Sequence, residues 1–390
     1  MCAGGGAVGA AARKSYRSPP DRMRCALGTM RRMSAPIVVT VVGNRPQYIK
    51  CAVVSRLLRE RVHEVLVDTG QHYDHGLAGV FFEQLPIPRP DVSLGVGSGS
   101  HAEQTARSLV GIERVLVEQD VRLVLVYGDT NATLAGALAA AKLGVPVAHV
   151  EAGLRSYDRS MPEEVNRVLT DHIAELLFCP TEAAVGNLER EGIADGVSQV
   201  GDVMNDLALT SLTPAVEAAT LTRLGLQRGR FAFATIHRPI NADSPLRLAA
   251  IFGALASIDE PVLVALHPRT RVTLEKEGLD RGLGDNITLV EPVGYFESLA
   301  LTGNARVVIT DSGGVQKEAY VLGTPCITLR DRTEWVETVE SGWNVLVDAD
   351  ARALAAALDA PPSAAARPPF YGDGHAGERI VAAVADFLSA

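Results

Sequence analysis

Residues 306–320 read Arg306-Val-Val-Ile-Thr-Asp-Ser-Gly-Gly-Val-Gln-Lys-Glu-Ala-Tyr320. The apolar, β-branched run at 306–310 predicts a buried strand, and the residues after the two glycines predict a helix. Gly313 and Gly314 allow backbone N–H groups at the helix N-terminus to approach a diphosphate, and Glu318 follows one turn later as an acceptor for ribose hydroxyls. Together with Ser312, these residues predict a nucleotide-sugar cradle. The alternative is a simple glycine turn.

The same alternation of strand and helix runs through the rest of the chain. Apolar strands are expected at 36–42, 62–68, 121–127 and 145–151, with helices at 101–118 and 132–143. The rhythm restarts near residue 230, with strands at 231–235, 262–266, 287–290, 306–310 and 326–329. Continuous apolar strands between helices are typical of a parallel sheet covered on both faces. The sequence therefore predicts an α/β protein with two doubly wound, Rossmann-like domains.

Breaks in this pattern predict the domain boundaries. Residues 1–35 are expected to be a disordered basic leader, or to precede the true start of the protein. The N-terminal Rossmann-like domain is expected at 36–204, and the C-terminal one, with the nucleotide cradle, at 205–369. A linker is expected within 205–230. The alanine-rich stretch 351–366 and the proline pairs that follow it break the pattern, and 378–388 predicts a last helix.

Composition excludes several classes of protein. A chain of 390 residues that is 47% hydrophobic and 21% charged is long enough for two sizeable cores and too apolar for a disordered protein. The cysteines are few and odd in number, without the spacing of a metal site, which predicts free thiols in a reducing compartment. We therefore expect a cytosolic protein. The cysteines are Cys2, Cys25, Cys51, Cys179 and Cys326.

The charge is distributed unevenly along the chain. Residues 1–35 hold seven basic residues and one acid, so they carry +6 of the net charge of −9 and leave −15 for the remainder. An acidic body argues against nucleic acid as a partner, because backbone phosphates are bound by basic surfaces. The sequence contains neither an apolar run of about 18 residues that would span a membrane nor the apolar region of a signal peptide.

Cations and histidines follow several predicted strands, where ligands of open parallel sheets bind. Arg45 and Lys50 lie in the loop and helix start at 43–50, which favours an anion, although both are also consistent with plain surface cations. His237 and His267 each end a strand close to an arginine. Neither a GxGxxG fingerprint after a strand nor Walker A spacing is present, so no motif predicts a bound NAD or a P-loop.

Three acids complete the strand-end pattern. Asp129 and Glu151 follow two strands of the first half and are expected at one edge of the sheet, where paired carboxylates suit proton transfer. For Asp129 the alternative is a helix N-cap. Glu163 begins a predicted helix and shares a face with Arg167, four residues on, which is equally consistent with a surface ion pair.

The motifs, taken in order, resemble those of the non-hydrolysing UDP-N-acetylglucosamine 2-epimerases, from about Ile37 to Leu388. The segments that carry the resemblance are Gly43-Asn-Arg-Pro, Gly70-Gln-His-Tyr, Gly128-Asp-Thr-Asn, His149-Val-Glu-Ala-Gly-Leu-Arg, Pro162-Glu-Glu-Val-Asn-Arg, Thr235-Ile-His-Arg, His267-Pro-Arg, Asp311-Ser-Gly-Gly-Val-Gln and Leu329-Arg-Asp-Arg-Thr-Glu. The resemblance implies the GT-B fold, in which two Rossmann-like domains enclose a cleft. It also implies that the segment 370–390 closes the chain against the N-terminal domain.

The resemblance extends to an activity and to its residues. It implies interconversion of UDP-GlcNAc and UDP-ManNAc for surface polysaccharide precursors, in a homodimer without a metal or redox cofactor. The residues expected to hold UDP are Arg45, His267, Ser312, Gly313, Gly314 and Glu318. Those expected at the sugar or in the chemistry are Lys50, Asp129, Glu151, Glu163, Arg167, His237 and Arg330. Some bacterial members bind substrate at a second, regulatory pocket, near the positions of Gln71 and His72.

This chain departs from the family pattern in places. Asn44 and Gln47 stand where the family usually has Thr and Glu. Ile240 replaces an acid after the His-Arg pair. Asp243 is a nearby carboxylate, but nothing in the sequence shows that it substitutes for that acid.

The sequence also leaves other activities open. The stretch 333–344 resembles the branch with epimerases of UDP-2,3-diacetamido-2,3-dideoxy-glucuronic acid, whose carboxylate needs a cation. The candidate cations are Arg155, Arg159, Arg167 and Arg238. A GT-B glycosyltransferase or a sensor of UDP-sugars would share the cradle.

Overall fold

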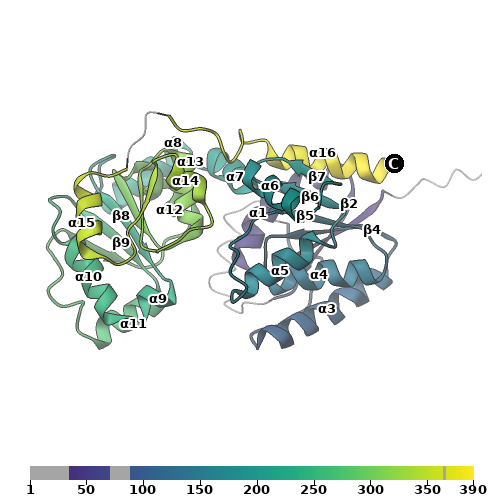
Figure 1. Cartoon of the computed structure of the whole chain (residues 1–390), viewed down its shortest axis with the longest axis horizontal. Coiled ribbons are helices and arrows are strands. Elements are labelled where there is room, and N and C mark those ends of the chain that lie inside the picture. The colour runs from purple at the N-terminus through teal and green to yellow at the C-terminus, as the bar shows by residue number, and fades with distance from the viewer. Residues whose placement is uncertain (1–34, 71–87, 363–365) are drawn as a thin grey trace, which may run out of the picture. The chain divides into compact units, whose positions relative to one another are not determined.

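The computed structural model describes residues 35–70, 88–362 and 366–390 (Figure 1). The predicted leader and the positions Gln71 and His72 lie outside these ranges. Within them the chain forms two sheets in which the strand pairs are parallel. The prediction of two parallel α/β sheets is confirmed.

The first sheet has the strand order β3-β2-β1-β4-β5-β6-β7. Its strands are β1 (Ile37–Val42), β2 (His63–Asp68), β3 (Val92–Ser93), β4 (Val121–Tyr127), β5 (Val147–Val150), β6 (Leu176–Cys179) and β7 (Val197–Gln199). Its helices are α1 (Arg45–Leu58), α3 (His101–Val117), α4 (Asn131–Lys142), α5 (Pro162–Asp171), α6 (Glu182–Arg190), α7 (Val203–Ser211) and α16 (Ala376–Ser389). The sequence analysis did not predict β3, β6 and β7.

The second sheet has the order β10-β9-β8-β11-β12-β13. Its strands are β8 (Ala232–Ile236), β9 (Val262–Leu266), β10 (Ile287–Val290), β11 (Val307–Thr310), β12 (Cys326–Thr328) and β13 (Asn344–Leu346). Its helices are α8 (Pro214–Leu224), α9 (Pro239–Ala242), α10 (Pro245–Leu255), α11 (Pro268–Lys276), α12 (Tyr295–Asn304), α13 (Gly313–Leu322), α14 (Val336–Glu340) and α15 (Ala351–Asp359). This is the doubly wound Rossmann order, in which the direction of winding reverses between β8 and β11.

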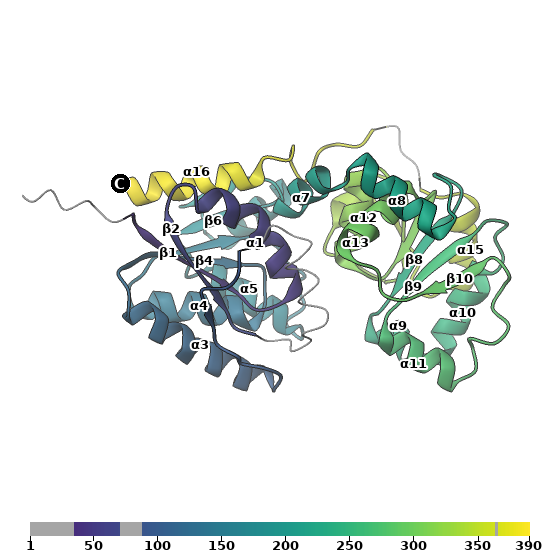
Figure 2. The same ribbon diagram turned by 180° about the vertical axis from the view of Figure 1, so that it is seen from behind.

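Helices cover both faces of each sheet. On the first sheet, α1, α7 and α16 pack on one face, while α3 and α4 cover the other (Figure 1, Figure 2). On the second sheet, α10 and α15 pack opposite α8, α12 and α13. The strands carry apolar side chains on both sides for this reason, which explains their continuous hydrophobic runs.

Two segments differ from the sequence prediction. The stretch 205–230, where a linker was expected, is mostly helical, because α7 and α8 fill it with only residues 212 and 213 between them. Thr213 caps α8 and Pro214 occupies its first turn, a position where proline favours a helix. The alanine-rich stretch also forms a helix, α15, which Asp350 caps and which buries Leu354 and Leu358.

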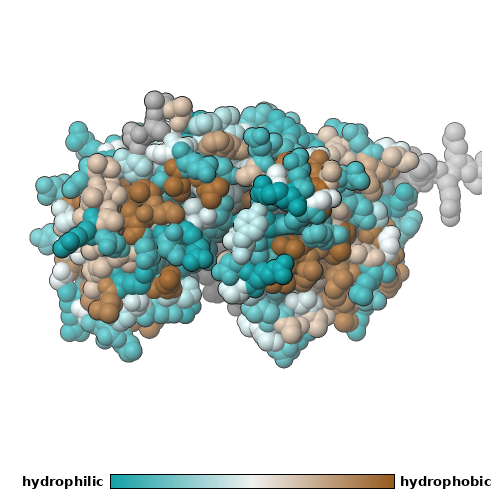
Figure 3. Space-filling model, viewed as in Figure 1, coloured by the Kyte–Doolittle hydropathy of each residue, from teal (hydrophilic) through white to brown (hydrophobic). Residues whose placement is uncertain are grey.

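The described surface is mixed in polarity. Figure 3 shows hydrophilic side chains over much of this face and a hydrophobic area over α4 and α5, where Leu143, Val165 and Leu169 are exposed. Within the described ranges, helices long and apolar enough to cross a membrane are absent. Cys51, Cys179 and Cys326 are buried free thiols, as predicted.

The last helix is an integral part of the first core. Ile380 on α16 is fully buried in the cluster that also contains residues of α1 and α7. Asp206 of α7 accepts a hydrogen bond from the backbone N–H of Gly377 at 2.8 Å, which satisfies a donor at the start of α16.

We expect Ile380→Ala to lower the free energy of unfolding by about 2–5 kcal/mol, because the truncation leaves a cavity under α16. Urea denaturation followed by circular dichroism measures this. The matched control is Asp386→Ala, which is exposed on the same helix and should change stability by less than about 0.5 kcal/mol. Equal stability of the two variants would contradict the packing described here.

Candidate active site

A cavity of about 530 Å³ lies at the carboxyl ends of strands from both sheets. The winding of each sheet reverses between two central strands, and the loops after these strands, β1, β4, β8 and β11, contribute to its lining. This is where open parallel sheets bind ligands. Nine of the residues predicted from the sequence line it: Lys50, Asp129, Glu151, His237, His267, Ser312, Gly313, Gly314 and Glu318.

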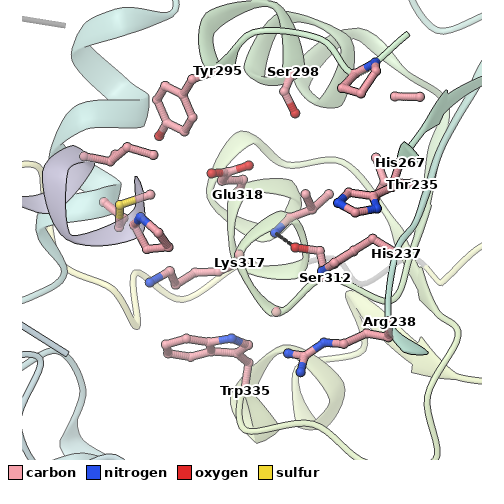
Figure 4. Close-up of a pocket in the computed structure, with 18 of the residues that line it drawn as sticks. Thr235, His237, Arg238, His267, Tyr295, Ser298, Ser312, Lys317, Glu318 and Trp335 are labelled. Atoms are coloured by element: carbon pink, nitrogen blue, oxygen red, sulfur yellow. Dashed lines mark hydrogen bonds between the residues drawn. The ribbon is translucent and has the colours of Figure 1, made fainter. Parts of the chain in front are cut away.

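The predicted nucleotide cradle lies at the start of α13, beside the cavity. Ser312 is the N-cap of α13, and its Oγ accepts a hydrogen bond from the N–H of Val315 at 3.5 Å (Figure 4). A Cβ on Gly313 would lie 3.3 Å from side-chain atoms of Glu334 and Trp335, so glycine lets these groups approach the helix start. The two glycines thus form the turn at the N-terminus of α13, a ten-residue helix that faces the cavity. At this end the helix dipole favours an anion.

Glu151 has a strained backbone. Its φ is 73°, in the left-handed region that side chains other than glycine rarely adopt, at a cost of order 1–3 kcal/mol. Its carboxylate accepts a hydrogen bond from Nζ of Lys50 on α1. A Cβ on Gly128 would lie 3.2 Å from both of these charged atoms, so the glycine allows the pair to contact the loop after β4.

A buried histidine joins the two acidic loops. His149 on β5 is fully buried, and its ring nitrogens lie 2.7 Å from the carbonyl oxygen of Gly128 and 2.6 Å from Oδ1 of Asp171. Burial alone would raise the pKa of Asp171, but His149 and Arg155 hold it below its ordinary value. The histidine thus fixes the loop that carries Asp129 against the strand that ends at Glu151.

Asp129 is not the helix cap that the sequence left open. Thr130 caps α4, with its side chain accepting from the N–H of Thr133. The carboxylate of Asp129 instead contacts the guanidinium of Arg167, and its backbone oxygen accepts a hydrogen bond from Asn166 at 2.9 Å. Asp129 is therefore held in the cavity wall by α5.

Lys50 is an unusual cation. Burial and the nearby charge of Lys317 lower its pKa to about 8, against the opposing effects of Asp129 and Asp202. Its ammonium group therefore loses a proton more easily than that of an exposed lysine.

Comparison with known proteins identifies the family of this chain. The family model for UDP-N-acetylglucosamine 2-epimerase matches residues 56–385. The chain belongs to this family of isomerases.

Its relatives are similar over most of their length. A UDP-N-acetylglucosamine 2-epimerase homolog of Methanococcus maripaludis is 51% identical over 80% of this chain and 88% of its own. UDP-2,3-diacetamido-2,3-dideoxy-D-glucuronate 2-epimerase of Pseudomonas aeruginosa is 49% identical, with the same coverage. The crystal structure of Methanocaldococcus jannaschii UDP-GlcNAc 2-epimerase in complex with UDP-GlcNAc and UDP is similar to the chain with a TM-score of 0.79 and 41% identity, over 89% of this chain and 99% of that one. The fold is that of the family, two parallel-sheet α/β domains of the GT-B kind.

One departure from the epimerase family pattern is absorbed inside the protein. Gln47 is buried, and its side chain accepts from the N–H of Gly43 at 2.8 Å and donates to the carbonyl oxygen of Tyr127 at 2.9 Å. This amide therefore joins the loop after β1 to the end of β4. Asn44 caps α1, and Arg45 begins that helix, but the Arg45 side chain lies outside the described atoms.

A second departure from the family pattern lies close to His237 in the sequence. Ile240 is 60% exposed, and Asp243 pairs with Arg269, so neither supports the histidine. Nδ1 of His237 lies 2.9 Å from Oδ1 of Asp311, which also accepts from the backbone N–H of His237. In this structure the partner of His237 is therefore Asp311, and that of Asp243 is Arg269.

Three predicted residues lie behind the cavity wall or outside it. Glu163 is exposed in the first turn of α5, and Arg167 contacts Asp129 and Glu164 rather than Glu163. Arg330 is paired with Glu334 at 2.8 Å, and it is Glu334 that lines the cavity. Among the described residues around the cavity, Glu163, Arg167 and Arg330 are not part of the lining.

The sequence analysis missed several residues that line the cavity. Lys317 and Trp335 project into it from α13 and from the loop before α14 (Figure 4). In the sequence, a lysine within a helix and a tryptophan in a loop are ordinary surface and core residues, and no local pattern distinguishes them. Further lining residues that were not predicted include Tyr295, Ser298 and Glu334.

We expect Asp311→Asn to destabilise the protein at pH 7 by about 1–3 kcal/mol. Burial would raise the pKa of Asp311, but hydrogen bonds from His237 and Asn241 lower it below the unfolded-state value. The carboxylate therefore stabilises the fold above that unfolded-state value, and the contribution fades as the pH falls through the lowered folded-state pKa.

Urea unfolding of both proteins as a function of pH measures this difference, which should shrink in acid. Asp285→Asn, at an exposed carboxylate of the same half of the chain, is the control and should leave stability unchanged at each pH. A pH-independent difference for Asp311→Asn would show that the Asp311 charge does not stabilise the fold.

Proposed function

We propose that this protein is a UDP-N-acetylglucosamine 2-epimerase that interconverts UDP-GlcNAc and UDP-ManNAc by elimination and re-addition of UDP. The observation that carries the proposal is that Asp129 and Glu151 line the same cavity as the cradle Ser312-Gly313-Gly314. The binding of UDP-GlcNAc and UDP by the 41% identical relative supports it.

The chemistry requires both halves of the cavity. The C2–H bond of the sugar is not acidic, because no carbonyl is adjacent to it. When the C1–O bond breaks, its electron pair leaves on the β-phosphate oxygen of UDP, C2 loses its proton, and a C1=C2 double bond forms, giving 2-acetamidoglucal. Re-addition of UDP at C1, with a proton delivered to the opposite face of C2, gives the epimer.

The cradle has the task of holding UDP after the C1–O bond breaks. The N-terminus of α13 offers backbone N–H groups and the positive end of its dipole to the diphosphate. We assign His237 and Arg330 to stabilising the diphosphate. His267, whose ring centroid lies 6.2 Å from that of His237, is assigned to binding UDP. Burial and the charge of His237 lower the pKa of His267, which makes its neutral form more populated before an anion binds.

The acids have the task of moving protons. We assign Asp129, Glu151 and Glu163 to this collectively, since transfer at two faces of C2 needs more than one group. Asp129 and Glu151 line the cavity, whereas Glu163 is exposed at the start of α5, outside that lining. Arg45, Lys50, Arg167 and Arg330 complete the proposed binding set.

A second candidate substrate is UDP-2,3-diacetamido-2,3-dideoxy-glucuronate, which the name of the 49% identical Pseudomonas relative favours. A uronic acid needs a cation near C6 of the sugar. Arg155 is buried against Asp171 and Glu191, and Arg167 is paired with Asp129, but Arg238 lines the cavity. We therefore assign Arg238 to binding the carboxylate of this second candidate substrate.

We expect Asp129→Asn, Glu151→Gln and Glu163→Gln each to lower turnover by about 100-fold or more, because proton transfer is lost. UDP binding, measured by calorimetry, should change little, since the cradle is intact. Near wild-type turnover in all three amide variants would exclude the carboxylates from proton transfer.

We expect the protein, incubated with UDP-GlcNAc alone in D₂O, to form UDP-ManNAc and to incorporate deuterium at C2. The value of kcat/KM is then compared between UDP-GlcNAc and UDP-2,3-diacetamido-2,3-dideoxy-glucuronate, without nicotinamide or a glycosyl acceptor. A preference for the uronic acid of more than about tenfold, or about 1.4 kcal/mol of transition-state binding, would select the second substrate. Turnover that appears only with an acceptor would instead indicate a glycosyltransferase.

A further inference from the structure

Lys317 is a buried lysine that the proposed mechanism does not use. It lies in the second turn of α13, and its side chain is 4% exposed. Its ammonium group contacts the carboxylate of Asp202, lies 3.8 Å from Oε1 of Glu151, and stands 4.3 Å from the centroid of the Trp335 ring (Figure 4). Removing a lysine from water is costly, so these contacts must compensate for the lost hydration.

Asp202 lies where two segments of the chain meet. Its side chain caps α7 by accepting from the N–H of Met204 at 2.8 Å, and it is 2% exposed. Its backbone N–H donates to the carbonyl oxygen of Tyr371 at 2.9 Å, in the segment that leads to α16. The ion pair with Lys317 therefore joins α13 of the second sheet to both of these segments.

Lys317 neutralises Asp202 through their direct contact, so its approach to Glu151 is an additional interaction. Oε2 of Glu151 contacts Lys50, and Oε1 faces Lys317, so each oxygen has its own ammonium group. Because the backbone of Glu151 is strained, its side chain keeps this position only if its surroundings hold it. Lys50 contributes from α1 and Lys317 from α13.

We propose that Lys317 is a positioning residue for the epimerisation, which holds the Glu151 carboxylate between two ammonium groups at the C2 position of the sugar. The inference rests on the proposed function, because it assumes that Glu151 transfers a proton. It adds a residue that binds neither UDP nor the reacting carbon and acts through Glu151 and Lys50.

The charges around Lys50 supply a measurement specific to this role. The groups that face it are Lys317, Arg167, Asp129, Asp202 and Glu151. Lys317 is among the causes that lower the pKa of Lys50, so removing its charge raises that pKa. In a plot of activity against pH, the change that reflects loss of the Lys50 proton should then move to higher pH.

The test compares Lys317→Met, Lys317→Arg and the double variant Asp202→Asn/Lys317→Met with the full-length wild-type protein. We expect Lys317→Met to lower kcat by about 30-fold or more with KM changed less than about threefold, and to shift the pH profile upward. The double variant has no unpaired carboxylate at residue 202, yet its kcat should stay low. Lys317→Arg, which keeps a cation, should recover most of kcat.

The matched control is Arg306→Met, which removes a cation paired with Glu260 at the opposite end of the second sheet. It should keep the wild-type kcat and pH profile. Recovery of kcat in the double variant would overturn the proposal, because Lys317 would then only neutralise Asp202. An unshifted pH profile of Lys317→Met would overturn the proposal as well. So would loss of UDP binding in both Lys317→Met and the double variant Asp202→Asn/Lys317→Met.

The wild-type assay separates this inference from the function on which it rests. Absence of epimerisation of either sugar by the wild-type protein would reject the proposed function. An active wild-type protein whose Lys317→Met variant is equally active would reject only the role of Lys317.

Discussion

The parallel pairing of the strands is the constraint on which the rest of this structure depends. In a parallel sheet all strands end at the same edge, so the loops that follow them converge. The described strands form two such sheets, and the cavity is built from the loops after their central strands. Lys50 and Glu318 are distant in sequence but line the cavity together, because each lies in the helix that follows a central strand.

Charge balance is the second condition at this edge. The cations in and behind the cavity wall are each paired with carboxylates. Lys50, Arg167 and Lys317 contact the carboxylates of Asp129, Glu151, Glu164 and Asp202. Mutual pairing is what permits so many charges with little solvent exposure.

The departures from the family pattern illustrate how such a site tolerates change. Gln47 uses both ends of its amide to join two loops, a task that needs a donor and an acceptor at one position. Asp311 accepts from the backbone of His237 and Arg238, so the loop after β8 is anchored even though Ile240 carries no charge. The supporting group lies on the neighbouring strand end, at no fixed distance along the sequence.

The sequence by itself determined the two α/β halves, the helix start at Ser312 and the position of Asp129 and Glu151 after strands of one sheet. These are local patterns: β-branched runs, a glycine turn before a helix, and polar residues directly after strands. Only the tertiary structure placed Lys317 between Asp202 and Glu151 and made Asp311 the partner of His237. Such contacts join residues of different strands and helices. Their burial arises from packing between distant segments, which leaves no period or spacing in the sequence.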